Sequence, residues 1–517
     1  MAKRKRKTEH LDGTNVKNRN SRKSKTQLRD LPMDILSSII SRLQINEAIR
    51  TSILSRHWNH VWCHHTNLNF VWSTMMPRDS NLYSSPAVKR CKQRVFIKRV
   101  DDVLLQHSGA GVEHISIHFD LDGSHTADVN RWITFVIGSK AKALSLRLLY
   151  HAPEYLLERE VDDSIELYSF PFQLFDAGNG SHLKFLLLTS ILVKVPADFE
   201  GFTKLKKLYL CDLRIADEDL QHLLSKCSLL EFLSVTYCKT IIGLRVSHPA
   251  SHLEQLEVAS CSSLREIELN NDLTILEYRG HPISFISNGN PCLTNIFIKL
   301  SQADTSIKHL FTELPGTLRP QNAPTSGFGG LERDISSIRH PQFVSLRSLI
   351  LEMDIFAPPR TKPDVLDVAY LLQAAPFIER LEFHMFVRYG HKPYRREHAN
   401  DIELRSLSLH PHPHLKAVRI TGFFGHKDQL ELAFYILANS PKLESMVIDP
   451  TVVILNPRDE ALYLPDDCVF LDGYKIATEF LRDTDERHVV EVMSICPSTN
   501  ILMSLRKRLL LSHRLKK

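Results

Sequence analysis

Residues 205–238 read LKKLYLCDLRIADEDLQHLLSKCSLLEFLSVTYC, and the apolar pattern LxxLxL occurs twice within them. Its positions are Leu205, Leu208, Leu210 and then Leu230, Leu233, Val235. Between the two copies, ADEDLQHLLSKCSLL has the spacing of an amphipathic helix, with Leu220, Leu223 and Leu224 on one face. A single strand and helix cannot bury this apolar surface alone, so we predict a stack of such units.

The pattern recurs on both sides of this stretch, which predicts an α/β leucine-rich-repeat solenoid with strands on its concave face. The further copies are Leu183/Leu186/Leu188, Leu253/Leu256/Val258, Leu346/Leu349/Leu351, Ile378/Leu381/Phe383, Leu415/Val418/Ile420 and Leu443/Met446/Ile448, with shorter versions at Leu264/Ile267/Leu269 and Leu273/Leu276/Tyr278. The first four copies begin 22, 25 and 23 residues apart, and the later ones 28–37 residues apart, so the solenoid is expected to be irregular.

A different pattern precedes the repeats. Pro32 and Asp34 suit the first turn of a helix, and a stripe of large apolar residues follows at helical spacing. Two more short helices are expected, one after Asn46 and one carrying Trp58 and Trp62. Three such helices are too small to enclose these side chains. The stripe therefore packs either on a partner protein or on the rest of this chain.

The stretch LRDLPMDILSSIISRLQINEAIRTSILSRHWNHVWCHHTNLNF resembles the F-box of plant F-box proteins over some 40 residues. It departs from the common pattern at Gln44-Ile45 and at His57. The resemblance implies docking on the Skp-type adaptor of a Skp–cullin–F-box ubiquitin ligase, and through it on the cullin and RING subunits. The positions that match adaptor contacts are Leu31, Pro32, Ile35, Leu36, Ile39, Leu43, Ala48, Leu54, Ser55, Trp58 and Trp62.

Near the C-terminus, HPHLKAVRITGFFGHKDQLELAFYILANSPKLESMVIDP is similar to the FBD module of many plant F-box proteins. The chain thus resembles the F-box–LRR–FBD type, and a strand–helix–strand unit is expected here. The resulting division is a disordered basic tail at 1–26, an F-box at 27–70, a connecting segment at 71–110, leucine-rich repeats at 111–300, a loop-rich insertion at 301–341, further repeat-like units at 342–400, an FBD-like module at 401–455 and a C-terminal segment at 456–517.

The family resemblance implies a receptor without catalytic activity, which binds a target protein and raises its effective concentration beside the ligase. Concave faces of repeat arrays commonly bind partners. The candidate target-binding residues are Lys206, Lys207, Tyr209, Glu231, Ser234, Glu254 and Glu257. Two alternatives stay open at this point: a nuclear scaffold that does not cause degradation, and a nucleic-acid-associated protein that acts through the N-terminal tail.

The formal charge of +6 is concentrated in that tail, because residues 1–25 hold ten Lys/Arg against two Asp/Glu. The remaining chain is close to neutral, which disfavours a nucleic-acid-binding body. The run Lys3, Arg4, Lys5, Arg6 and Lys7 is either a nuclear localisation signal or a solvated tail. Without an apolar secretory core or a long apolar run, we expect a nuclear and/or cytoplasmic protein without membrane spans.

Signals for chemistry are weak in this sequence. The nine cysteines lack CxxC spacing, and Cys238 and Cys261 occupy the position after a repeat strand where Asn or Cys is usual. Phosphate-loop, dinucleotide, hydrolase, zinc-protease and kinase motifs do not occur. The histidines at 57–65 and the run His410-Pro411-His412-Pro413-His414 are interpreted as surface and loop residues. We therefore expect no metal, no cofactor and no enzymatic activity.

Overall fold

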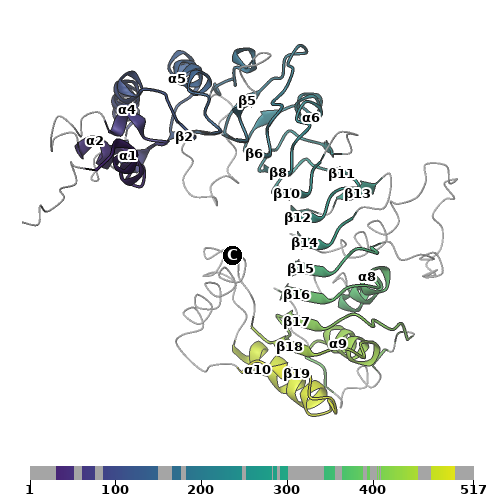
Figure 1. The fold of residues 1–517 in the computed structure, drawn as a ribbon. Coiled ribbons are helices and arrows are strands. Elements are labelled where there is room, and N and C mark those ends of the chain that lie inside the picture. Colours follow the sequence, from purple (N-terminus) through teal and green to yellow (C-terminus); the bar gives the residue numbers. More distant parts are fainter. Residues whose placement is uncertain are drawn as a thin grey trace, which may run out of the picture.

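The computed structural model describes residues 31–51, 61–75, 85–149, 166–175, 182–246, 252–281, 283–287, 292–300, 343–355, 364–387, 393–395, 404–405, 407, 409–451 and 467–494. Within these ranges the chain forms one long arc of parallel strands, with helices along its outer side (Figure 1). The predicted basic tail, with Lys3, Arg4, Lys5, Arg6 and Lys7, and the whole of the predicted 301–341 insertion lie outside the described residues.

The inner layer is a parallel sheet, in which the described residues contribute fourteen strands. In spatial order these are β1 (Asn67–Val71), β2 (His114–Phe119), β3 (Ala143–Leu148), β4 (Phe185–Thr189), β6 (Lys207–Cys211), β8 (Phe232–Thr236), β10 (Gln255–Ala259), β12 (Ile275–Gly280), β14 (Asn295–Leu300), β15 (Ser348–Ile355), β16 (Arg380–Val387), β17 (Ala417–Thr421), β18 (Ser445–Asp449) and β19 (Val490–Val492). Spatial order follows chain order, as a solenoid requires.

The register explains why LxxLxL specifies this sheet. Leu208 pairs with Leu233, which pairs with Leu256, so each strand repeats the alternation of its neighbour. Side chains at successive strand positions point to opposite faces. The pattern's leucines enter the core, where all three of these are fully buried, and the intervening residues face the concave side. The irregular leucine-rich-repeat solenoid expected from the sequence is thereby confirmed.

Helices cover the convex side of the sheet, and their apolar faces close the core. They are α4 (Pro86–Gln106), α5 (Thr126–Gly138), α6 (Asp217–Ser225), α8 (Val368–Ala374) and α9 (Lys427–Asn439), with η5 (Gly123–His125), η7 (Phe172–Leu174) and η10 (Val365–Asp367). In α6, the helix predicted from the sequence, Leu220 and Leu223 are buried and Leu224 is half-buried.

Short strands replace helices on parts of the convex side. They form the sheets β13 (Ser284–Ser287), β11 (Glu266–Leu269), β9 (Gly243–Arg245), and β5 (Leu192–Val193) with β7 (Arg214–Ile215). The prediction that Leu264/Ile267/Leu269 form a strand of the concave sheet is therefore wrong. Ile267 and Leu269 belong to β11, which is a strand of the convex side, and Leu264 precedes it. A short apolar alternation is the same in both layers, and only the packing distinguishes them.

At the N-terminal end, α1 (Met33–Ile40), α2 (Ile45–Arg50) and the turn η4 (Trp62–His64) pack on one another and lead directly into β1. The sheet thus begins at residue 67, within the stretch predicted as F-box. The stretch 71–110, predicted as a connection, contains α3 (Trp72–Met75) and the whole of α4. Because α4 supplies buried Phe96 and Val100, it is the convex helix of the first repeat.

At the C-terminal end, β17, α9 and β18 form the strand–helix–strand unit expected from the FBD-like sequence. Beyond it, α10 (Asp467–Ile476), the π-helix η12 (Ala477–Arg482) and β19 extend the array, with β19 paired to β18. None of the helices in the described ranges combines the length and apolarity that a membrane crossing needs.

Candidate functional site

The exposed face of α1 is the first candidate surface. Ile35 is 45% exposed, Ile39 is 38% exposed, and Leu43, just after the helix, is 36% exposed. Leu36 and Ile40 lie on the opposite face and are buried. The stripe expected from the sequence therefore divides into a buried half and an exposed half. An exposed apolar row of this kind is typical of a helix that contacts a partner protein.

The predicted adaptor contacts fall into three groups. Pro32, Ile35, Ile39 and Leu43 are exposed, and Leu31 is half-buried. The structure buries Leu36, Ala48 and Trp62 in the chain's own core. The remaining positions, Leu54, Ser55 and Trp58, lie outside the described residues.

Two buried histidines join the F-box to the first repeat. The amide of Asn67 donates to His65 Nδ1 (3.1 Å), so Nε2 carries the proton and donates to the Leu43 carbonyl (3.0 Å). The same arrangement follows at His107, which accepts from the Gly109 amide through Nδ1 and contacts the His65 carbonyl through Nε2 (3.0 Å). Burial lowers the pKa of both, that of His107 to about 4, so both are neutral connectors at neutral pH.

The concave face is the second candidate surface, and its N-terminal half is aromatic. Phe185 on β4 packs against Tyr209 on β6, with 5.2 Å between ring centroids. Tyr209 packs in turn against Phe232 on β8, at 4.8 Å. All three rings are half-buried, so part of each remains accessible. Burial, helped by the charge of Glu257, raises the pKa of Tyr209, which stays neutral.

The C-terminal half of the concave face carries matched charges. Arg279 on β12 lies 3.2 Å from a carboxylate oxygen of Glu257 and equally far from one of Glu277. Further along the sheet, the ion pairs are Lys299–Glu352, Arg380–Glu382, His384–Glu382 and Arg419–Asp449. These pairs neutralise the charge of the face locally.

Two of these carboxyl groups differ in acidity although they lie on neighbouring strands. The hydrogen bond from His384 is the main cause that lowers the pKa of Glu382 to about 2. Burial raises the pKa of Glu352, despite the opposing effect of Lys299. Glu352 and Glu382 nevertheless each form an ion pair with a basic side chain, so we interpret both as structural residues.

The predicted target-binding residues lie on two neighbouring rows. Lys207, Tyr209, Ser234 and Glu257 are on the concave face of β6, β8 and β10, as expected, although Ser234 is only 4% exposed. Lys206, Glu231 and Glu254 directly precede these strands and line the edge of the sheet at which they begin. On that edge, Lys206 and Glu231 form an ion pair.

Sequence reasoning missed other residues of the same face. Phe185 and Phe232 complete the aromatic row. Arg279, Lys299 and His384 occupy positions equivalent to one another in later repeats. The sequence does indicate these residues, because each lies between or beside the core positions of an LxxLxL-type copy. Their common placement on the concave face follows only when all the copies are aligned in register.

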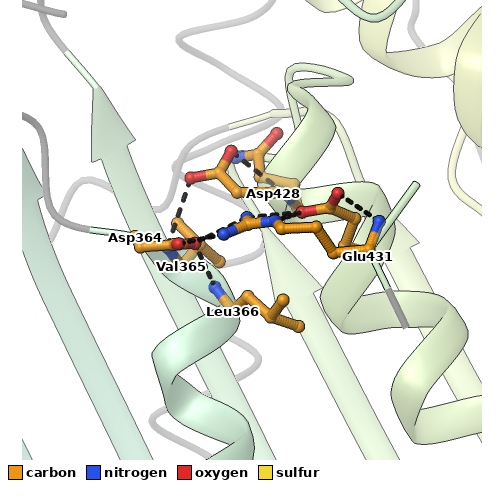
Figure 2. Close-up of polar contacts among 7 residues, drawn as sticks. Asp364, Val365, Leu366, Asp428 and Glu431 are labelled. Carbon is orange, nitrogen blue, oxygen red and sulfur yellow. Dashed lines mark hydrogen bonds and ion pairs between the residues drawn. The ribbon is translucent and has the colours of Figure 1, made fainter. Parts of the chain in front are cut away.

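A polar cluster on the convex side holds the FBD-like unit against the repeats. The Arg405 side chain bridges Asp364, the N-cap of η10, and Glu431 of α9. Asp364 also accepts from the Leu366 amide, and Asp428 accepts from the Val365 amide (Figure 2). Glu431 is 1% exposed, so its charge depends on this arginine. The two carboxylates raise the pKa of Arg405 further, so this guanidinium keeps its charge.

The interpretation of the histidines at 57–65 as surface residues is wrong for His65, which is 2% exposed. His65 is a connector between the F-box and β1, and His412 is buried against Tyr435, 3.0 Å from its hydroxyl oxygen. Burial lowers the pKa of His412 to about 4. Within the described ranges, no group of three or more His, Cys, Asp or Glu side chains is placed to hold a metal ion. His57 and His60 are not among the described residues.

Comparison with known proteins agrees with this architecture. The F-box domain model matches residues 28–69, and the model "At1g61320/AtMIF1, LRR domain" matches residues 103–476. F-box/FBD/LRR-repeat protein At1g13570 of Arabidopsis thaliana is 33% identical over 43% of this chain and 46% of its own length. F-box/LRR-repeat protein At3g03360 of the same plant is 25% identical over 74% of this chain and 75% of its own length.

The chain thus spans about half the length of the first of these relatives and three quarters of the second. The F-box match coincides with α1, α2 and η4, and the LRR match covers most of the solenoid. An interaction adaptor without an enzymatic domain is the role typical of such proteins. This chain belongs to the F-box/LRR-repeat family of plants, with an LRR domain of the At1g61320/AtMIF1 type.

Proposed function

We propose that this protein is the substrate-recognition subunit of a Skp–cullin–F-box ubiquitin ligase. In this proposal the F-box docks on the Skp-type adaptor, and the concave face of the repeats binds the target. The observation that carries it is the exposed row Ile35, Ile39 and Leu43 within the F-box match. Water contacts these side chains in the isolated chain, and burying one of them contributes about 1.5–3 kcal/mol.

Within this proposal, exposure and burial divide the predicted contacts into residues that would dock and residues that would support them. Among the predicted contacts, the exposed ones would touch the adaptor, together with Leu31. The buried Leu36, Ala48 and Trp62 would hold α1 in place from behind. Substitution of the first group should impair docking alone, whereas substitution of the second should impair folding as well.

The receptor itself would break and form no bonds. It would hold a target so that lysines of the target stay near a charged ubiquitin-conjugating enzyme, which raises their effective concentration. The basic run at residues 3–7 is proposed as a nuclear localisation signal, with nucleus and cytoplasm as the compartments.

The test is a binding measurement with purified Skp-type adaptor. The variant Ile35→Asp with Ile39→Asp should bind roughly a thousandfold more weakly, if each loss costs about 2 kcal/mol. Leu105→Asp with Leu471→Asp is the matched control, because these leucines are 84% and 47% exposed and lie on α4 and α10. Both variants should melt close to the wild-type temperature.

Retained adaptor binding in the α1 variant would overturn the docking assignment. Equal loss in both variants would show that added charge, rather than this surface, weakens the complex. If the folded wild-type chain binds none of several adaptor paralogues, the ligase proposal fails, and the protein is an interaction scaffold of another kind.

A further inference from the structure

Positive charge is unevenly distributed over the concave face. In the described residues, strands β1 to β8 present Arg147 and Lys207 there, but no carboxylate. The first acidic side chain of this face is Glu257 on β10. Along the edge where the strands begin, Lys142, Lys184 and Lys206 occupy three consecutive repeats, joined by backbone hydrogen bonds of 2.7 and 2.9 Å.

Part of this charge is not compensated within the described chain. Lys142 pairs with Glu113 (2.7 Å), and Lys206 pairs with Glu231 (2.5 Å). No carboxylate of the described residues pairs with Lys184 or Lys207, and both side chains are exposed. On the later strands, by contrast, Arg279, Lys299, Arg380 and Arg419 each have an acidic partner. The unpaired lysines therefore distinguish this region from the rest of the face.

The unpaired lysines adjoin the aromatic row. Phe185 directly follows Lys184, and in the sheet register it pairs with Lys207. Tyr209 and Phe232 continue the row over β6 and β8. These five residues define a basic–aromatic patch: Lys184, Phe185, Lys207, Tyr209 and Phe232.

We propose that the basic–aromatic patch binds an acidic, extended segment of the target protein, with an apolar side chain of that segment against the rings. The inference rests on the proposed function, since it assigns the chemistry of the target. Cations that lack an internal partner favour carboxylates, and accessible aromatic rings supply the buried apolar contact of an interface core.

A short acidic peptide fits better than a nucleic acid. Glu254 and Glu257 lie beside the patch at β10, so carboxylates would repel a phosphate backbone that continued past β8. Binding of single-stranded nucleic acid uses a basic groove that tracks the backbone over several nucleotides.

The experiment uses the full chain in complex with its adaptor, or alone if no adaptor binds. The probe is a fluorescein-labelled peptide of Asp and Glu around a central Phe-Leu pair, followed by fluorescence anisotropy. Lys184→Glu with Lys207→Glu should weaken binding about tenfold or more. Lys98→Glu with Lys475→Glu makes the same change in net charge at exposed positions on α4 and α10, and should leave affinity unchanged.

Binding should also weaken with added salt, and it should be lost with a peptide in which Asn and Gln replace the acids. The proposal is overturned if the acidic peptide does not bind, or if the two double variants bind it equally. Oligothymidine that binds in place of the peptide, and is lost in the Lys184/Lys207 variant, overturns it in favour of nucleic acid. Adaptor binding, measured separately on the same preparations, decides the proposed function independently of these outcomes.

Discussion

At the scale of single residues, the neutral histidines between F-box and repeats make stability depend on pH. The pKa of His107 is about 4 in the folded chain and about 6.5 when unfolded, because burial disfavours the charged ring. The unfolded chain thus binds more protons between these values. The contribution of neutral His107 to the stability of the folded chain is complete above about pH 6.5 and is lost as the pH falls towards 4.

We predict that His107→Gln flattens this dependence. The glutamine amide can still donate to the His65 carbonyl, but it does not titrate. The melting temperature of the variant should fall less steeply between pH 6.5 and 4 than that of the wild type, with the remaining slope due in part to His412. Parallel curves for the two proteins would contradict the assignment.

The charge of Arg405 compensates the buried carboxylate of Glu431. Arg405→Ala should lower the free energy of unfolding by about 3 kcal/mol, because Glu431 would stay buried without its cation. Arg131→Ala is the control, since Arg131 pairs with Asp101 and Asp128 at the surface and its side chain is 52% exposed. That change should cost less than about 1 kcal/mol. Equal effects in urea unfolding would show that the Arg405–Glu431 ion pair is not needed.

At the scale of elements, the turn from β17 into α9 requires a glycine at position 422. Gly422 has φ of +67°, and a Cβ there would lie 1.9 Å from the Met385 carbonyl oxygen of β16. Its own carbonyl accepts from Gln429 of α9 (3.0 Å), so this turn places the helix. The strand–helix–strand unit therefore tolerates no side chain at this position.

We predict that Gly422→Ala destabilises the protein by at least about 2 kcal/mol, from backbone strain and the clash. Gly138→Ala, at the end of α5, meets no atom within 4 Å and should change stability by no more than about 1 kcal/mol. Urea unfolding of both variants provides the comparison. A tolerated alanine at position 422 would mean that β16 can move away from the turn.

At the scale of the whole molecule, each repeat contacts mainly its neighbours, so damage should stay local. Leu233 on β8 is fully buried between Leu208 and Leu256. Leu233→Ala should cost about 2–5 kcal/mol and accelerate amide hydrogen exchange in β6, β8 and β10. Exchange in β17 and β18 should be unchanged. Faster exchange along the entire sheet would instead indicate one cooperative unit. Thr203→Ala, at an exposed turn, is the control.

Much of the solenoid could be predicted, because leucines at fixed spacing specify both strand and burial. The apolar copies from β4 to β10, and again from β15 to β18, correspond to strands of the sheet. The first strands were harder, since β2 reads HISIHF and its pattern uses Val112, Ile115 and Ile117 instead of leucine. The pairing of β19 with β18 could not be predicted, because long-range register leaves no mark in a three-residue strand.

The candidate surfaces were predictable in outline only. Helical spacing identified the stripe of α1, but it could not tell that Leu36 faces the core while Ile35 and Ile39 face water. That division depends on contacts with residues far along the chain. Likewise, the sequence does not distinguish Lys184 from Lys206. The structure does, because Glu231 pairs with Lys206 and not with Lys184.

The join between F-box and sheet has a mechanical consequence. Hydrogen bonds join Leu43 to His65 and His65 to His107. Because β1 begins three residues after His64, the described junction is short and held on both sides. Two bodies connected in this way keep a nearly fixed relative orientation, whereas bodies joined by a flexible linker sample many orientations. Under the proposed function, the arc would set the direction in which a bound target is presented, and a longer junction would bring a wider range of the target's lysines within reach.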